Sequence, residues 1–243
     1  MDTENAENTE NTEIAKTVLY DADARQRFAF EVTEGGEKFD TAHHYEPLSD
    51  ERYIKYLSDA NIRGDGDEVE GNELEISTNL WSDLVVEVEN IEVEDGDDWK
   101  ALIDGKEKED SLDMFLAAAV VEPESKTTGK RRLAAGSTEK VVTEAYFNGV
   151  PVQQTHVLKK KSDEWQKKYS RIQARRFQPE ATRGVRNKPK IKFVPQDEKI
   201  GKLYDEQFIE QTGFANGNIP LRFKTRVIHY LYGGTKLDEQ EKK

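Results

Sequence analysis

The sequence matches itself without gaps when it is shifted by 113 positions. The tripeptide Ser-Asp-Glu at 49–51 then falls on the same tripeptide at 162–164. Because several matches recur in the same order, we predict two copies of one unit of about 100 residues. The other matched pairs are Gly36 with Gly149, His43 with His156, Lys55 and Tyr56 with Lys168 and Tyr169, and, at a shift of about 123, Leu80 and Trp81 with Leu203 and Tyr204.

Each copy opens with the pattern of a β-hairpin. Residues 27–33 and 37–45 are strand-like runs separated by a Glu-Gly-Gly turn, and the first of them alternates clearly. Residues 140–147 and 150–158 flank Asn148-Gly149, a strong hairpin signal because both residues tolerate positive φ. We therefore expect one hairpin at the start of each copy.

Three segments with helical spacing of apolar residues follow each hairpin. The first begins at Ser49 or Ser162, where a serine cap precedes Asp and Glu at the positive end of the helix. The residues around 84–93 also allow a strand, since many of them are β-branched. The later helices are expected around residues 80–88 and 112–119 in the first copy, and around 200–208 and 223–231 in the second.

These patterns predict an α+β fold, a tandem pseudo-repeat in which each unit is a β-hairpin packed on about three helices. A lone hairpin is unstable in water, so each should dock on its helices or pair with the other in one four-stranded sheet. The predicted organisation is a disordered acidic leader at 1–14, a first, acidic repeat at 15–121, a linker at 122–137, a second, basic repeat at 138–237 and a polar tail at 238–243.

Charge is divided unevenly between the two predicted copies. The formal net charge of the chain is −13. Residues 1–125 carry 10 basic and 36 acidic side chains, a net of −26, whereas residues 126–243 carry 26 basic and 13 acidic side chains, a net of +13. Such a difference attracts opposite halves of neighbouring molecules. We expect it to steer the docking of complementary protein surfaces.

Several kinds of site have no signal in the sequence. The chain has no cysteine, which excludes disulfides, a thiol nucleophile and a Cys-ligated metal. It has no phosphate-binding glycine motif, and the acidic stretch at 65–70 departs from a calcium loop after its first ligands. His43 and His156 stand at matching strand positions, which suits a metal or catalytic pair as well as two ordinary polar strand residues. We predict no catalytic residue, metal or cofactor, so an enzyme or metal-binding protein is the third interpretation.

Basic residues gather in the predicted linker and the second copy, where they form a predicted interaction surface. Its partner would be an acidic protein, such as the first copy of a neighbouring molecule or another subunit of an assembly. The same cations, with the aromatic residues among 126–192, could neutralise phosphates and stack on bases, so nucleic-acid binding is the alternative function. The surface consists of Lys130, Arg131, Arg132, Arg171, Arg175, Arg176, Arg183, Arg186, Lys188 and Lys190.

In its general style the chain resembles accessory proteins of tailed bacteriophages, which include virion-assembly and tail or head–tail morphogenesis factors. The resemblance rests on the Asn148-Gly149 hairpin, the Ser-Asp-Glu helix starts and the closing aromatic-Leu helices, and it covers most of the chain. It implies a non-enzymatic structural or assembly protein that works through protein–protein docking. No apolar run approaches the roughly 20 residues that span a bilayer, so we expect the host cytoplasm or the virion and no membrane partner.

Overall fold

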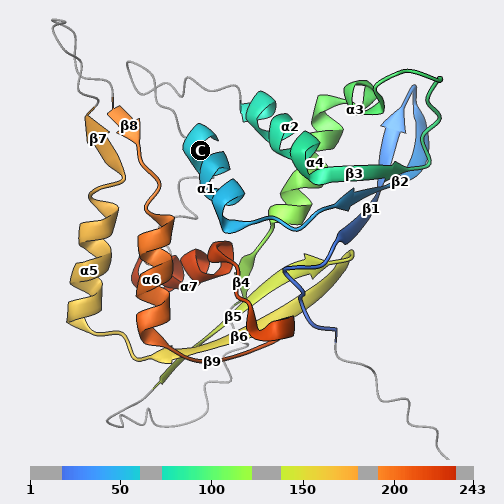
Figure 1. The fold of residues 1–243 in the computed structure, drawn as a ribbon. Coiled ribbons are helices and arrows are strands. Elements are labelled where there is room, and N and C mark those ends of the chain that lie inside the picture. Colours follow the sequence, from blue (N-terminus) through green and yellow to red (C-terminus); the bar gives the residue numbers. More distant parts are fainter. Residues whose placement is uncertain (1–17, 61–72, 122–137, 180–190, 234–243) are drawn as a thin grey trace, which may run out of the picture.

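The computed structural model describes residues 18–60, 73–121, 138–179 and 191–233, and their fold is α+β (Figure 1). Seven α-helices pack on two main antiparallel sheets within these ranges. The predicted leader, linker and tail lie outside the described residues. In the described part of the chain no helix is both long enough and apolar enough to cross a bilayer.

The first half of the chain builds a three-stranded sheet of order β1-β2-β3 with helices beside it (Figure 1). A two-glycine turn closes its hairpin, and both Gly35 and Gly36 have positive φ. The elements are β1 (Gln26–Glu34), β2 (Glu37–Tyr45), α1 (Asp50–Ala60), α2 (Glu73–Leu84), β3 (Val85–Glu89), α3 (Trp99–Leu102) and α4 (Gly105–Leu116).

The second half builds a four-stranded sheet of order β4-β5-β6-β9. The predicted Asn148-Gly149 turn is confirmed, with positive φ at both residues. The elements are β4 (Ala119–Val121), β5 (Thr138–Phe147), β6 (Val150–Lys159), α5 (Asp163–Gln173), the ribbon β7 (Phe177–Pro179) and β8 (Ile191–Phe193), α6 (Asp197–Gln207), β9 (Phe208–Thr212), the short 3-10 helix η1 (Ala215–Gly217) and α7 (Leu221–Gly233).

The expectation of one sheet made from both hairpins is wrong. β2 pairs with β3, and β6 pairs with β9, so each hairpin receives a third strand from its own half. The reason is that a β-branched or aromatic run follows directly on α2 and on α6 and occupies the free edge of the nearer hairpin. For the same reason residues 85–88 form β3, the strand alternative to the expected helix, and Phe208 belongs to β9 rather than to a helix. Ala119, expected at the end of a helix, belongs to β4, which pairs with β5 of the second half.

The two sheets share their register in detail. Phe28 lies opposite His43 in the first hairpin, and Val141 lies opposite His156 in the second. The pairing of the second and third strands is shifted by a bulge just after His44 in one sheet and just after Val157 in the other. Such matching irregularities place corresponding side chains on the same face of each sheet.

Two aromatic cores lie on these sheets, and the first described residues, which lead into β1, contact the second half. Trp81 is fully buried in the first core, whereas Tyr20 is fully buried in the second. The amide of Tyr20 donates to the Gly213 carbonyl at 2.8 Å, and its carbonyl accepts from the Ala215 amide at 2.8 Å. We call the surrounding residues the Tyr20 socket; they are Phe147, Gly213, Phe214, Ala215 and Phe223.

Further contacts join the halves. β4 follows the last helix of the first half and pairs with β5 of the second. The amide of Leu221 at the start of α7 donates to Oδ1 of Asp50 in α1 at 2.9 Å. The Arg222 guanidinium lies 5.2 Å from the ring centre of Phe115. The second half is therefore packed with pieces of the first.

Candidate functional site

A groove of about 930 Å³ lies beside the β1-β2 turn in the first half. It is bounded by that hairpin, the chain that follows β3, α3 and the first turns of α4. Four of its apolar side chains are exposed to solvent, most of all Leu102 at 59%. The apolar lining consists of Phe30, Val32, Phe39, Ile91, Val93, Trp99, Leu102, Ile103 and Met114.

Carboxylates surround this apolar surface. Seven of them line the groove against one lysine, Lys106, whose Nζ lies 2.6 Å from Asp110 and 3.4 Å from Glu109. These hydrogen bonds raise the pKa of Lys106, so the single cation is held by acidic residues of its own helix. The groove is therefore strongly acidic. Its carboxylates are Glu31, Glu34, Asp40, Glu92, Asp104, Glu107 and Asp110.

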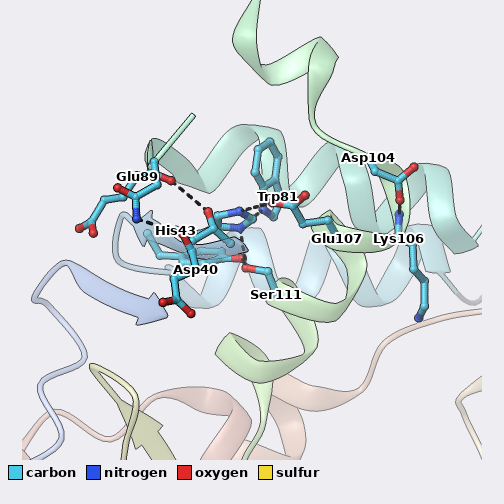
Figure 2. A network of polar contacts seen from close by, with 11 residues as sticks. Asp40, His43, Trp81, Glu89, Asp104, Lys106, Glu107 and Ser111 are labelled. Carbon is cyan, nitrogen blue, oxygen red and sulfur yellow. Dashed lines mark hydrogen bonds and ion pairs between the residues drawn. The ribbon is translucent and has the colours of Figure 1, made fainter. Parts of the chain in front are cut away.

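Local sequence explains how α4 presents these groups. Asp104 caps the helix, and its Oδ1 accepts from the Lys106 amide at 2.8 Å (Figure 2). An aspartate at this position accepts a hydrogen bond from an otherwise free backbone amide, and the positive end of the helix dipole stabilises its negative charge. The helix begins at Gly105, and Glu107 lies in its first turn, facing the sheet.

A buried network holds Glu107 in place (Figure 2). The Oε1 atom of Glu107 lies 3.0 Å from Nε2 of His43, and the other ring nitrogen, Nδ1, lies 3.1 Å from Trp81 Nε1 and 2.7 Å from Ser111 Oγ. An indole N–H only donates, so Nδ1 of His43 must accept. Nε2 therefore carries the hydrogen and donates it to Glu107, which fixes both the ring and the carboxylate.

Ser111, His43 and Glu107 resemble the components of a hydrolytic triad, but their arrangement does not suit one. Both Ser111 and His43 are 0% exposed, and Ser111 Oγ is also hydrogen-bonded to the Tyr45 hydroxyl at 2.5 Å. A nucleophile must reach its substrate. Only Glu107, whose side chain is 16% exposed, brings this network to the groove. The network therefore positions a carboxylate that can hold a cation.

A neighbouring carboxylate is neutralised by its own partners. Arg27 donates from Nε and Nη2 to Glu89 at 2.7 and 2.6 Å, and His44 Nε2 lies 2.7 Å from the same carboxylate. These hydrogen bonds lower the pKa of Glu89 to about 2. Glu89 thus belongs to a structural ion pair of the sheet and is not part of the acidic lining.

The second half repeats the buried histidine with other partners. His156 is 0% exposed, its Nδ1 lies 2.8 Å from the Tyr204 hydroxyl, and its Nε2 lies 2.9 Å from Thr143 Oγ1. Thr143 donates to Gln154 Oε1, so it accepts from His156 Nε2, and Nδ1 accepts from Tyr204. Burial lowers the pKa of His156 to about 4. Both histidines are buried structural residues, and no group of three or more potential ligands suits a metal among the described residues.

A smaller cleft of about 200 Å³ lies between α5 and α6 in the second half. Two residues of the predicted basic surface, Arg171 and Arg175, line it together with Lys168 and Lys199. Lys168 is paired with Glu206, which also lines the cleft, at 2.9 Å. The cleft carries four cations and one carboxylate, so its charge is opposite to that of the groove.

Arg176 is the only other residue of the predicted surface within the described ranges, and it does not line this cleft. Arg176 turns away from it, with Nη2 3.1 Å from His229 Nε2 and 3.5 Å from Asp197. Seven predicted residues lie outside the described ranges. These are Lys130, Arg131, Arg132, Arg183, Arg186, Lys188 and Lys190.

Sequence reasoning did not identify the groove. Its residues come from four separate segments, and their approach depends on the pairing of β2 with β3. The one local signal is Ile91-Glu92-Val93-Glu94, which alternates apolar and acidic residues directly after β3. No family model, curated protein or solved structure matches this chain.

Proposed function

We propose that this chain is a non-enzymatic structural or assembly protein that holds other polypeptides through two oppositely charged surfaces. The observation that carries the proposal is the exposed acidic groove in the first half. The basic cleft in the second half supports it, because the two features give one molecule complementary docking surfaces.

The chemistry of the groove favours a basic polypeptide that also carries apolar side chains. Exposed apolar residues such as Leu102 and Phe39 gain from being covered, while the surrounding carboxylates attract Lys and Arg. Within the described ranges the Asn90 carbonyl and the Glu92 amide make no backbone hydrogen bond. An extended segment could pair with both groups.

The two halves are, in this proposal, copies of one unit that have diverged in charge. Several matched features support a duplication: the registers and bulges of the two sheets, the order of their elements, and a buried histidine held in each half by an aromatic donor from the helix before the third strand. A duplicated unit with opposite charges suits a protein that links subunits in a series.

We extend the proposal to the assembly of a tailed-bacteriophage particle, in which the chain would act in the host cytoplasm or remain in the virion. The support is the resemblance in the hairpin, the helix starts and the closing helices. A docking protein with two charged surfaces suits the joining of virion subunits.

Peptide binding to the groove tests the proposed function. Trp99 lines the groove, so its fluorescence reports occupation. A peptide of alternating Lys and Leu should bind, and its affinity should fall steeply between about 10 mM and 1 M salt, where the Debye length shrinks from roughly 30 to 3 Å. A matched Glu-Leu peptide should not bind. Failure of the Lys-Leu peptide to bind at low salt would contradict the proposal.

The basic cleft favours nucleic acid as the second candidate. Lys168, Arg171, Arg175 and Lys199 lie close enough together to contact neighbouring phosphates. A gel shift with duplex and single-stranded DNA at low salt separates the two functions. A shift that disappears in Arg171→Ala/Arg175→Ala would favour nucleic acid, and the absence of any shift would remove this candidate.

A further inference from the structure

In the second half a segment of the chain lies at the place that corresponds to the groove of the first half. Tyr20 occupies this place in an extended conformation and forms a parallel bridge with Phe214. Its ring centre lies 5.1 Å from that of Phe223 and 5.6 Å from that of Phe147. The Tyr20 socket therefore shows how this kind of unit binds an extended segment.

Every residue of the Tyr20 socket has a counterpart that lines the groove. The counterparts are defined by position in the fold: the last residue of the first hairpin strand, the first three residues after the third strand, and the third residue of the closing helix. In each pair the socket residue is given first: Phe147 and Glu34, Gly213 and Asn90, Phe214 and Ile91, Ala215 and Glu92, and Phe223 and Glu107.

The backbone at the two places is alike. Gly213 and Asn90 directly follow β9 and β3, and both have positive φ, at 96° and 59°. In the socket, the carbonyl of Gly213 and the amide of Ala215 bind the backbone of Tyr20. The corresponding groups in the groove are the Asn90 carbonyl and the Glu92 amide. The groove thus offers the same two backbone partners to an incoming segment.

The segment of the second half that corresponds to Tyr20 carries the charge that the groove requires. Gln26 faces Tyr45 across the first hairpin, and Glu139 faces Leu158 across the second. Tyr20 stands six residues before Gln26, and Leu133 stands equally far before Glu139. Residues 17–20 read Thr-Val-Leu-Tyr, and Tyr20 fills an aromatic socket, whereas residues 130–133 read Lys-Arg-Arg-Leu. Three cations and a leucine match an acidic groove with an apolar floor.

A molecule cannot place residues 130–133 in its own groove. The turn end of β5 lies against the start of β1, where Asn148 Oδ1 accepts from the Arg27 amide at 2.8 Å. Ten-residue β5 extends about 30 Å from that turn, and its start lies across the molecule from the β1-β2 turn (Figure 1). Leu133 precedes Thr138 by only five bonds, which span at most about 18 Å. The matching groove must belong to another molecule.

We propose that residues 130–133 of one molecule dock in the acidic groove of a second copy, with Leu133 placed as Tyr20 is in its socket. This inference rests on the proposed docking function and names its partner. The contact joins different surfaces of the two copies, so it is heterologous and adds molecules head to tail. Copies of the chain then assemble in a linear series. Each contact between neighbouring copies resembles the contact between Tyr20 and its socket within one molecule.

Charge reversal at each side of the joint tests the inference. The groove variant Glu34→Lys/Glu92→Lys changes two exposed residues, and the segment variant is Arg131→Glu/Arg132→Glu. Each should weaken self-association of the full chain in analytical ultracentrifugation at low salt by at least about tenfold. The chain that carries both pairs of substitutions should recover association. The matched control Asp83→Lys/Glu87→Lys changes the net charge equally at exposed positions away from the groove and should associate like the wild type.

Mixing the variants gives a sharper result. The groove variant retains its basic segment and the segment variant retains its acidic groove, and the two altered surfaces are also complementary, so a mixture should associate in an alternating series although each variant alone associates weakly. A wild type that is monomeric at every salt concentration, or a mixture that associates no more strongly than either variant alone, would overturn the inference. If the Lys-Leu peptide nevertheless binds the groove, the docking function survives and only the choice of a second copy as partner fails.

Discussion

The residues that directly follow β3 and β9 share a positive φ but have different surroundings in the two halves. Gly213 and Asn90 both have positive φ, which favours glycine and is tolerated by asparagine. At Gly213 a side chain would also meet the backbone, because a Cβ there would lie 2.4 Å from the Gln153 carbonyl oxygen. The socket is therefore closed tightly around the backbone, while the groove has room for a side chain.

Substitution of Gly213 should be much more harmful than substitution of a glycine in an open turn. Gly213→Ala combines backbone strain with a backbone clash, so we expect a loss of about 2 kcal/mol or more in the free energy of unfolding. The control Gly149→Ala has positive φ but nothing within 4 Å of the added Cβ, so it should lose only about 1 kcal/mol. Urea unfolding measures both. Equal losses would contradict the close approach seen at Gly213.

Buried histidine gives the protein a definite sensitivity to acid. The pKa of His156 falls from 6.5 to about 4 on folding, so the unfolded chain binds more protons between these values. The contribution of neutral His156 to the free energy of unfolding is complete above pH 6.5 and is lost as the pH falls to about 4. The shift corresponds to roughly 3 kcal/mol at most. The pKa of His229 is also lowered to about 4 by burial and nearby arginines, so His229 adds to the loss of stability as the pH falls.

The variant His156→Gln should flatten this pH dependence. We expect it to be less stable than the wild type at pH 7 because it disturbs the contacts with Tyr204 and Thr143. The difference should shrink as the pH approaches 4, since the variant has no proton to gain at this position. Urea unfolding across this range measures both slopes. Parallel slopes in the two proteins would show that His156 is not the titrating group.

At the scale of elements, the starts of α1 and α5 could be predicted from their serine caps, whereas α2 and α4 begin about seven residues before the apolar spacing indicated. Ser162 and the two acidic residues after it form a local signal, and the helix begins there as expected. Where α2 and α6 end, the apolar pattern continues without a break into β3 and β9. The β-branched residues after α2 allowed a strand, but only the free edge of the neighbouring hairpin decides between a strand and a continued helix, and that edge is far away in the sequence.

The cap at the start of α5 should have a measurable effect on stability. Ser162 Oγ accepts from the Trp165 amide, so Ser162→Ala should lower the free energy of unfolding by about 1 kcal/mol. Ser162→Asp should retain most of the wild-type stability, because a carboxylate also caps the helix and is stabilised by the positive end of the helix dipole. Thermal unfolding compares the three proteins. An alanine variant as stable as the wild type would show that water replaces this cap at no cost.

On the scale of the whole molecule, the two halves are joined by exchanged pieces. Tyr20 completes the second core, β4 extends the second sheet, and Asp50 receives the first amide of α7. Opposite net charges on the two ends of the chain add long-range attraction to these contacts. A substitution at Tyr20, before the first strand, should therefore affect the stability of the second half.

Removal of the Tyr20 ring should test this dependence. Tyr20→Ala deletes a fully buried aromatic side chain and should cost about 3–5 kcal/mol of unfolding free energy. Tyr20→Phe keeps the ring but removes the hydroxyl that accepts from Gln26 and Arg222, so it should cost about 1–3 kcal/mol. Hydrogen exchange should show faster opening of β9 and α7 in the alanine variant. Unchanged protection there would contradict the role of Tyr20 in the second core.

The sequence by itself determined the hairpins, their turns, the starts of α1 and α5 and the division of charge, because each depends on neighbouring residues or on composition alone. The tertiary structure decided the third strands, the crossing of Tyr20 and β4, and the groove, because each requires segments far apart in the chain to meet. His43 illustrates the difference: its strand position could be predicted from alternation. Its contacts with Trp81, Ser111 and Glu107 exist only because α2 and α4 pack on the same face of the sheet.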